Sequence, residues 1–358
     1  MRSKQRKTVW VPLALAALLT AAALGWLLLR IPEGVSFAMD MGPGWNLANT
    51  LDAHGLGRGA GDTATYERYW GSEPASQAQI DAIAQAGFRT LRLPVTWFEH
   101  MDAQGRIDPA WMARVRTVAD MALAAGMRAI VNAHHDVWYE PAPERLDAAQ
   151  AAMRDVWGQI ATAFADCDER VLFEGMNEPR LLGHPEEWTA GTPEARACVN
   201  ALNAAFVETV RAAGGGNATR YLLIPAYAAG IGEEALAALR VPEDPCVMVS
   251  AHVYAPYGFT LDERGMAGWS PDTATDSQEM ADAFARLWRL FVSRGIPVVV
   301  TEFGAVDKSN EVARAAWAAA VMRLGRTYRI PCLWWDTALL EKGSHTWRYP
   351  ALLRALVR

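Results

Sequence analysis

Residues 171–180 read VLFEGMNEPR, and this stretch decides which fold suits the rest of the chain. Its first three residues form a short apolar run typical of a buried strand, and after Glu174, Gly175 and Met176 come Asn177, Glu178 and Pro179. Because Pro179 cannot continue a strand ladder, the chain turns there and leaves a carboxylate just past the strand. An isolated Asn-Glu pair could also be a helix cap or half of a salt bridge, but these flanking residues favour a functional carboxylate.

A second stretch, PVVVTEFGA at 297–305, repeats the pattern with Glu302 after an apolar run. A carboxylate is costly to bury without a partner or a purpose. Two glutamates at the same end of different strands are the pair that glycoside cleavage requires, because one protonates the leaving oxygen while the other attacks the anomeric carbon. In a retaining enzyme the two carboxyl groups lie about 5 Å apart.

Outward from these two runs, apolar segments alternate with helical periodicity along the whole chain. This alternation is typical of parallel βαβ units. An open doubly wound sheet would alternate in the same way, but no glycine-rich phosphate turn follows the first strand. We therefore predict an α/β fold, a single (β/α)8 TIM barrel. Its strands are expected at 44–47, 90–93, 129–132, 171–174, 221–224, 247–252, 297–301 and 332–335.

Helix boundary signals support the same fold. Ser76 caps an expected helix at 77–86 that Gly87 ends, and Asp108 with Pro109 opens another that runs to residue 125. Alanine-rich stretches at 148–165, 194–213 and 311–325 fit outer helices. No repeat or linker interrupts the chain after residue 35, so a second module is not expected.

The first thirty residues differ from the rest. Four basic residues lie within positions 2–7, and residues 9–29 are an unbroken apolar run. A run of 21 residues is longer than the apolar core of a cleaved signal peptide and suffices to span a bilayer. We predict a cytoplasmic tip and transmembrane anchor at 1–30, and a catalytic domain at 31–358 that lies in the periplasm or otherwise outside the cytoplasm. Secretion after signal cleavage is the alternative.

Composition narrows the partners. The net charge of −6 offers no basic field for nucleic acid, so nucleic acid is not expected as a partner. We expect a monomer whose partners are a polysaccharide substrate and, through the N-terminal helix, the inner membrane. Fifteen tryptophans could stack on sugar rings, although tryptophan also fills cores. The four cysteines show no metal-ligand spacing; Cys246 and Cys332 read as buried thiols, while a Cys167–Cys198 bridge stays open.

Taken together, these segments resemble glycoside hydrolase family 5, the cellulase-type family of retaining barrel enzymes, over residues 40 to 350. The likeness is strongest to its endo-β-1,4-glucanases, lichenases and xyloglucanases. It rests on GWNLANTLDA at 44–53, ERYWGSEP at 67–74, FRTLRLPVTW at 88–97, VNAHHD at 131–136, FEGMNEPR at 173–180, SAHVYAPYGFT at 250–260, TEFGAVDK at 301–308 and WWDTA at 334–338.

The resemblance implies a role for each residue around the glutamates. Glu178 would be the acid/base and Glu302 the nucleophile. Arg92 would keep Glu302 ionised by lowering its pKa. Tyr254 would hydrogen-bond the nucleophile, and His252 would lie near the acid/base.

The sugar-binding residues are expected to surround this pair. Asn177 can donate to a sugar hydroxyl. The resemblance assigns the pair His134 and His135 to the sugar beside the cleaved bond, and we expect His135 to make the contact with His134 as its support. Trp335 resembles the aromatic platform under the sugar, with Trp334 pointing away. Asn49 could contact substrate, although asparagine in a turn is equally often structural.

Two departures leave substrate preference open. Ala48 replaces the usual glycine, and Thr337 replaces an asparagine that could contact sugar. A β-mannanase or another β-glycanase with the same mechanism is the alternative. A non-catalytic glycan-binding protein should have lost a glutamate or Arg92. A metal-dependent hydrolase should have three convergent ligands, for which only the His-His-Asp run at 134–136 is suggestive. We expect neither a metal nor a cofactor.

Overall fold

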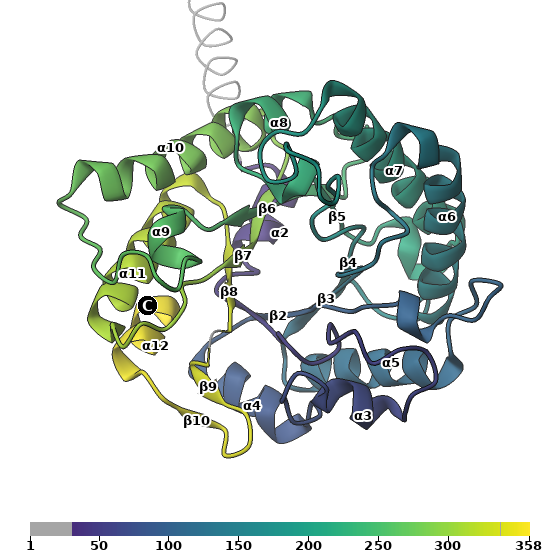
Figure 1. The fold of residues 1–358 in the computed structure, drawn as a ribbon, viewed down its shortest axis with the longest axis horizontal. Helices are drawn as coiled ribbons and strands as arrows, with labels where there is room; N and C mark the ends of the chain where they lie inside the picture. Colours follow the sequence, from purple (N-terminus) through teal and green to yellow (C-terminus); the bar gives the residue numbers. More distant parts are fainter. Residues whose placement is uncertain (1–30, 337) are drawn as a thin grey trace, which may run out of the picture.

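Eight short strands close into one parallel barrel within residues 31–336 and 338–358, the part of the chain that the computed structural model describes (Figure 1). Each strand pairs with the next one in the chain, and β8 returns to β1, where Asn46 lies opposite Trp335. The predicted barrel is confirmed, and every expected strand is present within a few residues. The strands are β1 (Gly44–Asn46), β2 (Thr90–Leu93), β3 (Arg128–Asn132), β4 (Val171–Glu174), β5 (Leu222–Pro225), β6 (Val247–Val253), β7 (Val298–Phe303) and β8 (Cys332–Trp335).

Helices surround the barrel, and their ends follow the predicted signals. The Ser76 hydroxyl accepts from the Gln79 N–H, and Gly87 ends the same helix with φ 111°. Asp108 caps the helix that begins at Pro109. The main helices are α4 (Gln77–Ala86), α5 (Pro109–Ala124), α6 (Leu146–Ala163), α7 (Pro193–Ala212), α8 (Glu233–Ala238), α10 (Ala274–Leu290), α11 (Glu311–Tyr328) and α12 (Pro350–Val357).

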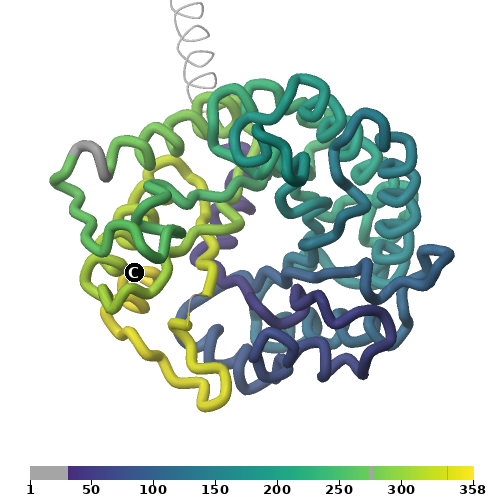
Figure 2. The backbone as a smooth tube through the Cα atoms, in the orientation of Figure 1, coloured from purple at the N-terminus to yellow at the C-terminus, as the bar shows by residue number. Residues whose placement is uncertain are grey.

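Short helices, a two-stranded hairpin and single 3₁₀ turns lie between the barrel strands and the main helices. Figure 2 follows the chain around the barrel, and its last helix packs against α11. The short helices are α2 (Glu33–Met39), α3 (Thr63–Arg68) and α9 (Tyr257–Thr260), and the hairpin strands are β9 (Leu340–Glu341) and β10 (Thr346–Trp347). Single 3₁₀ turns occupy Phe98–His100, Pro143–Arg145, Gly215–Ala218, Tyr227–Ala229 and Val292–Arg294.

The barrel interior changes from apolar to polar along the strands. Helix α2 closes the base, where Phe37 stacks on Tyr221 with ring centroids 4.2 Å apart. Above it lies an apolar layer formed by Ile130, Leu172, Leu223, Met248, Val299 and Leu333. Because side chains two residues apart share a face, the next layer holds Asn132 and Glu174, both fully buried. The polar layer therefore lies just below the carboxyl ends of the strands.

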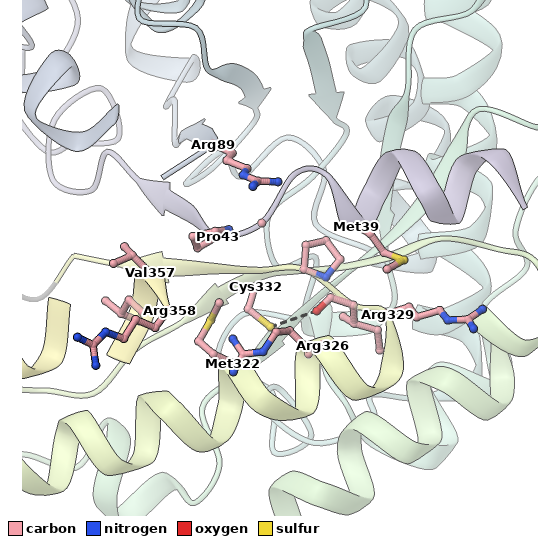
Figure 3. A pocket seen from close by; sticks show the side chains of 14 residues that line it. Met39, Pro43, Arg89, Met322, Arg326, Arg329, Cys332, Val357 and Arg358 are labelled. Carbon is pink, nitrogen blue, oxygen red and sulfur yellow. Dashed lines mark hydrogen bonds between the residues drawn. The ribbon is translucent and has the colours of Figure 1, made fainter. Parts of the chain in front are cut away.

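The opposite end of the barrel carries a separate cavity of about 460 Å³ (Figure 3). Pro43, Arg89 and Cys332 line it, and they lie at the starts of β1, β2 and β8. Its rim also includes Arg326, Arg329 and Arg358. None of the predicted site residues lines this cavity, so it is not the predicted active site.

Two sequence predictions concern the ends and the cysteines. The predicted transmembrane anchor falls on residues 1–30, which lie outside the described residues, as does Thr337. Among residues 31–336 and 338–358, no helix has both the length and the apolarity to cross a bilayer. All four cysteines are free thiols, so the Cys167–Cys198 bridge that the sequence left open is not formed.

Candidate active site

Two carboxylates face each other at the carboxyl ends of the strands. Glu178 lies just past β4, and Glu302 lies near the end of β7. One oxygen of each, together with a ring nitrogen of His252, lies within 4.8 Å of the others. The sequence predicted this meeting of two glutamates separated by more than 120 residues. The separation suits the retaining arrangement of about 5 Å.

Arg92, on β2, contacts Glu302 and has no exposed surface. Its Nη1 donates to Glu302 Oε1 at 2.6 Å and to Asn46 Oδ1 at 2.9 Å. Its Nε donates to Glu174 Oε2 at 2.6 Å, and its Nη2 donates to Asn177 Oδ1 at 2.7 Å. The expected contact with Glu302 is present, but Arg92 also forms an ion pair with a second carboxylate, that of Glu174.

Two side chains from the end of β6 complete the carboxylate pair. The Tyr254 hydroxyl donates to Glu302 Oε2 at 2.9 Å. His252 lies between the glutamates, with Nδ1 2.8 Å from Glu178 Oε1 and Nε2 3.6 Å from Glu302 Oε1. A register shift between β6 and β7 at this point pairs His252 directly with Glu302. Both residues therefore lie where the resemblance implied.

The electrostatics of the pair differ in one respect from expectation. Burial raises the pKa of Glu302, and although His252 and Arg92 act to lower it, the pKa stays above its ordinary value. Arg92 therefore lowers the pKa of Glu302, as the sequence predicted, but the effect of burial is larger. For Glu178, burial also raises the pKa, but the hydrogen bond with His252 outweighs it and lowers the pKa.

His252 is the reason that the two shifts differ. Burial lowers the pKa of His252, but the charges of Glu302 and Glu178 outweigh this effect and raise it. Without substrate, the proton therefore resides on the hydrogen-bonded Glu178–His252 pair, and interacting groups of this kind titrate as a unit. The proton can move across the 2.8 Å hydrogen bond between the two side chains.

The second group of predicted residues lies beside Glu178. His135 lines a pocket of about 200 Å³ together with His134 and Glu178. The ring of Trp335 stacks on that of His134 at 5.5 Å and 11°. Burial lowers the pKa of His135 to about 4 and lowers that of His134 well below its ordinary value, so both rings are neutral at pH 7. Trp334 points the other way, into the core against Phe303 and Trp317, as predicted.

The two predicted asparagines have different environments. Asn177 is buried and its Oδ1 accepts from Arg92, so its amide nitrogen is the group available as a donor to a sugar hydroxyl. Asn49 is exposed in a left-handed turn with φ 56°, and its backbone N–H donates to Asp52. It does not line the pocket that His135 and Glu178 share. Its contact with substrate stays a prediction.

One further group of side chains has the composition of a metal site. Asp52, His134 and His135 offer ligand atoms within 4.8 Å of one another. However, Asp52 accepts backbone N–H groups through both oxygens, and His134 Nδ1 is hydrogen-bonded to Asn132. Asp136, the third member of the His-His-Asp run, instead caps the backbone at Trp97–Phe98. Two of the three ligand groups are thus already occupied by hydrogen bonds.

Sequence reasoning did not assign Glu174, Asn46 and Asn132 to the site. Glu174 and Asn132 are directly paired across β3 and β4, and Asn46 is paired with Arg92 across β1 and β2. Strand alternation could have suggested Glu174, because it lies an even number of residues before Glu178. The pairings themselves depend on register, which the sequence does not state.

Comparison with known proteins agrees with this geometry. Residues 51–338 match the model of the family described as cellulase (glycosyl hydrolase family 5). The chain is 40% identical to Endoglucanase B of Ruminococcus albus over 339 residues, which cover 90% of this chain and 80% of that protein.

Two solved structures are also similar. A family 5 lichenase from Caldicellulosiruptor sp. F32 superposes with a TM-score of 0.88 at 34% identity, covering 92% of this chain and 96% of that one. A xyloglucan-specific endo-β-1,4-glucanase from a metagenomic library, XEG5A, in complex with cellotriose, has a TM-score of 0.85 at 34% identity, covering 90% and 97%. By its sequence, its barrel and its paired glutamates, the chain belongs to the cellulase family, glycosyl hydrolase family 5.

Proposed function

We propose that this protein is a retaining endo-β-1,4-glucanase that cleaves cellulose-like glucan, mixed-linkage glucan or xyloglucan. The observation that carries the proposal is the approach of Glu178 and Glu302 to within 4.8 Å. An inverting enzyme needs about 6.5–9.5 Å between its carboxyl groups to admit a water molecule. Double displacement therefore fits this site, and direct attack by water does not.

In the first step, Glu302 attacks the anomeric carbon. Arg92 and Tyr254 each donate to one of its oxygens and so hold the carboxylate in place. The departing glycosidic oxygen receives its proton from Glu178, which shares that proton with His252. As Glu302 forms its ester bond and loses its charge, His252 loses one of the two carboxylates that stabilise its proton. The proton is then more readily delivered through Glu178.

In the second step, water hydrolyses the glycosyl ester. Glu178 is now ionised, removes a proton from the water and acts as the general base. The oxygen of that water attacks the anomeric carbon, and Glu302 departs as a carboxylate. Arg92 and Tyr254 stabilise the charge that returns to it. The site then holds one proton on the Glu178–His252 pair, as it did at the start.

The substrate class rests on the sugar-facing surface and on the relatives. Trp335 supplies an aromatic face over which a sugar ring can stack. His134 is neutral and accepts at Nδ1 from Asn132, so its Nε2 carries the hydrogen and is a donor to a sugar hydroxyl. The similar proteins named above act, by their descriptions, as endoglucanase, lichenase and xyloglucan-specific endoglucanase.

A substrate panel tests the proposal. The full chain in detergent would be assayed on carboxymethyl cellulose, mixed-linkage glucan, xyloglucan and mannan, beside Glu302→Gln. We expect cleavage of at least one of the glucans and its loss in the variant, because an amide cannot act as the nucleophile. Activity of the variant on every glucan would refute the assignment, and cleavage of mannan alone would shift it to a mannanase.

We further propose that residues 9–29 anchor the protein in a membrane and that the barrel lies outside the cytoplasm. Only Arg30, Ile31 and Pro32 separate this apolar run from α2, which closes the barrel base. Three residues reach about 10 Å, so the base would lie on the membrane and the active site would open away from it. The arginine-rimmed cavity in Figure 3 would then face the lipid headgroups.

Fractionation tests this location. Intact chain should stay with membranes after a carbonate wash, and its barrel should be digested by protease added to spheroplasts. A soluble product whose first residue lies beyond position 30 would instead show secretion after cleavage. An anchored enzyme with this orientation could trim a polysaccharide as it passes through the envelope. Equal activity of an anchorless variant on purely extracellular substrate in cells would argue against that role.

A further inference from the structure

Glu174 is a third carboxylate in the site, and neither of the two displacement steps uses it. It lies on β4 below Glu178, with no exposed surface. Its Oε2 accepts from Arg92 Nε at 2.6 Å and from Asn132 Nδ2 at 3.2 Å. No hydrogen-bond partner within the described ranges 31–336 and 338–358 reaches its Oε1. Burial of a charge in this way is costly unless its partners compensate for it.

Arg92 connects Glu174 to the nucleophile. The guanidinium is equally close to both carboxylates, with nitrogen-oxygen distances of 2.6 Å to Glu174 and 2.6 Å to Glu302. The negative charge of Glu174 repels that of Glu302 and so offsets part of the stabilisation that Arg92 gives the nucleophile. In addition, the Nε contact fixes the plane of the guanidinium and so directs Nη1 toward Glu302.

Asn132 connects Glu174 to the sugar side of the site. Its Oδ1 accepts from the Val95 N–H at 3.0 Å, so Nδ2 must point the other way. There Nδ2 lies near both Glu174 Oε2 and His134 Nδ1. A carboxylate can only accept, so Glu174 favours the amide orientation in which Asn132 donates to His134 and leaves the His134 hydrogen on Nε2.

We propose that Glu174 is a positioning residue, a buried carboxylate that shares Arg92 with the nucleophile and thereby sets both the orientation of Arg92 and the basicity of Glu302. The inference rests on the proposed function and adds a residue to it. A carboxylate that Arg92 stabilised alone would be a weaker base, and a weaker base attacks the anomeric carbon more slowly. Glu174 keeps the nucleophile reactive by limiting the influence of Arg92.

If Glu174 acts in this way, its replacement should change the pH dependence of catalysis. The titratable or charged groups that face Glu302 are Arg92 from β2, Glu178 past β4, and His252 and Tyr254 from β6. Glu174→Gln removes a negative charge and leaves Arg92 fully available to Glu302. Both effects favour the ionised nucleophile, so its pKa falls.

The test is the pH profile of kcat/KM for the full chain on mixed-linkage glucan, between pH 3 and pH 8. The acid limb of this profile reports the free enzyme. We expect Glu174→Gln to move that limb about one pH unit lower than in the wild type. Glu174→Asp keeps the charge but withdraws it by one methylene, so its limb should lie between the two and serves if the Gln variant fails to fold.

Glu67→Gln is the matched control. Glu67 is another fully buried carboxylate with an arginine partner, Arg114 at 2.7 Å, but it lies on α3 away from the site. This variant should lose stability and keep the wild-type acid limb. A wild-type limb in both Glu174 variants, with kcat/KM merely lower at every pH, would overturn the proposal and make Glu174 a packing residue. Whether the wild-type enzyme cleaves the glucan at all tests the proposed function separately, because that result does not depend on the role of Glu174.

Discussion

The Tyr254 hydroxyl offers the sharpest test of how the nucleophile is held. It donates to Glu302 Oε2 at 2.9 Å, and it is half-buried whereas Glu302 is buried. Tyr254→Phe removes this donor and changes little else. A hydrogen bond to a charged group contributes about 1.5–3 kcal/mol, and one pKa unit corresponds to about 1.4 kcal/mol. The pKa of Glu302 should therefore rise by about 1–2 units.

The sign follows from which form loses its partner. The hydroxyl stabilises the ionised carboxylate, so its removal favours the protonated form and raises the pKa. Because Glu302 must be ionised to attack, the acid limb of kcat/KM should move to higher pH. This shift is opposite to the one expected for Glu174→Gln, although both variants alter the surroundings of the Glu302 carboxylate.

The assay is again kcat/KM on mixed-linkage glucan across pH 3–8. Tyr66→Phe is the control, because Tyr66 is a buried tyrosine whose hydroxyl bonds the Gly57 carbonyl away from the site. Its acid limb should match the wild type. An unchanged limb in Tyr254→Phe, or one displaced to lower pH, would refute the view that this hydroxyl stabilises the ionised nucleophile.

Further predictions concern the pH dependence of stability, the two tryptophans of β8 and the effect of a metal chelator. Burial lowers the pKa of His100 to about 4, so the unfolded chain binds a proton at this residue as the pH falls through 6.5, while the folded chain does not, and the fold loses stability. Urea unfolding at pH 7 and at pH 4 measures this loss, and we expect the free energy of unfolding to fall by about 3 kcal/mol less in His100→Phe than in the wild type. Equal losses in the two proteins would contradict this. Trp335→Ala should lower kcat/KM about tenfold with little loss of stability. Trp334→Ala should instead lower the free energy of unfolding by about 3–5 kcal/mol. The reverse pattern would mean that Trp334 faces the site and Trp335 lies in the core. Chelator should leave activity unchanged, because Asp52 and His134 already use ligand atoms in hydrogen bonds; loss that zinc restores would contradict this.

The barrel was predictable because its signals are local. The apolar runs form buried strands, and caps mark helix ends between them, as Ser76 and Gly87 do for α4. Carboxylates at the ends of such runs, as at Glu178 and Glu302, were predictable for the same reason. Parallel strands place their carboxyl ends on one rim. Alternation along β8 predicted that Trp334 and Trp335 point to opposite sides, and the family resemblance chose Trp335 for the site. In the structure Trp335 stacks on His134, and Trp334 lies in the core.

What the sequence could not supply is register between strands. The shift between β6 and β7 that pairs His252 with Glu302 has no sequence signal that we recognise. The same is true of the pairing that places Asn132 beside Glu174. The lowering effect of Arg92 on the pKa of Glu302 was predictable from the motif, but the larger opposing effect of burial was not. Non-local packing, rather than residue type, determined each of these features.

The central claim is that Glu302 forms a bond to the sugar across the short gap from Glu178. The most direct measurement incubates the full chain with a 2-deoxy-2-fluoro cellobioside that bears an activated leaving group, followed by peptide mapping. The slow second step should leave one fluorosugar on the peptide that contains residues 298–303, attached at Glu302. An enzyme that turns over the glucans without forming any adduct, or one that is labelled on another residue, would contradict this account.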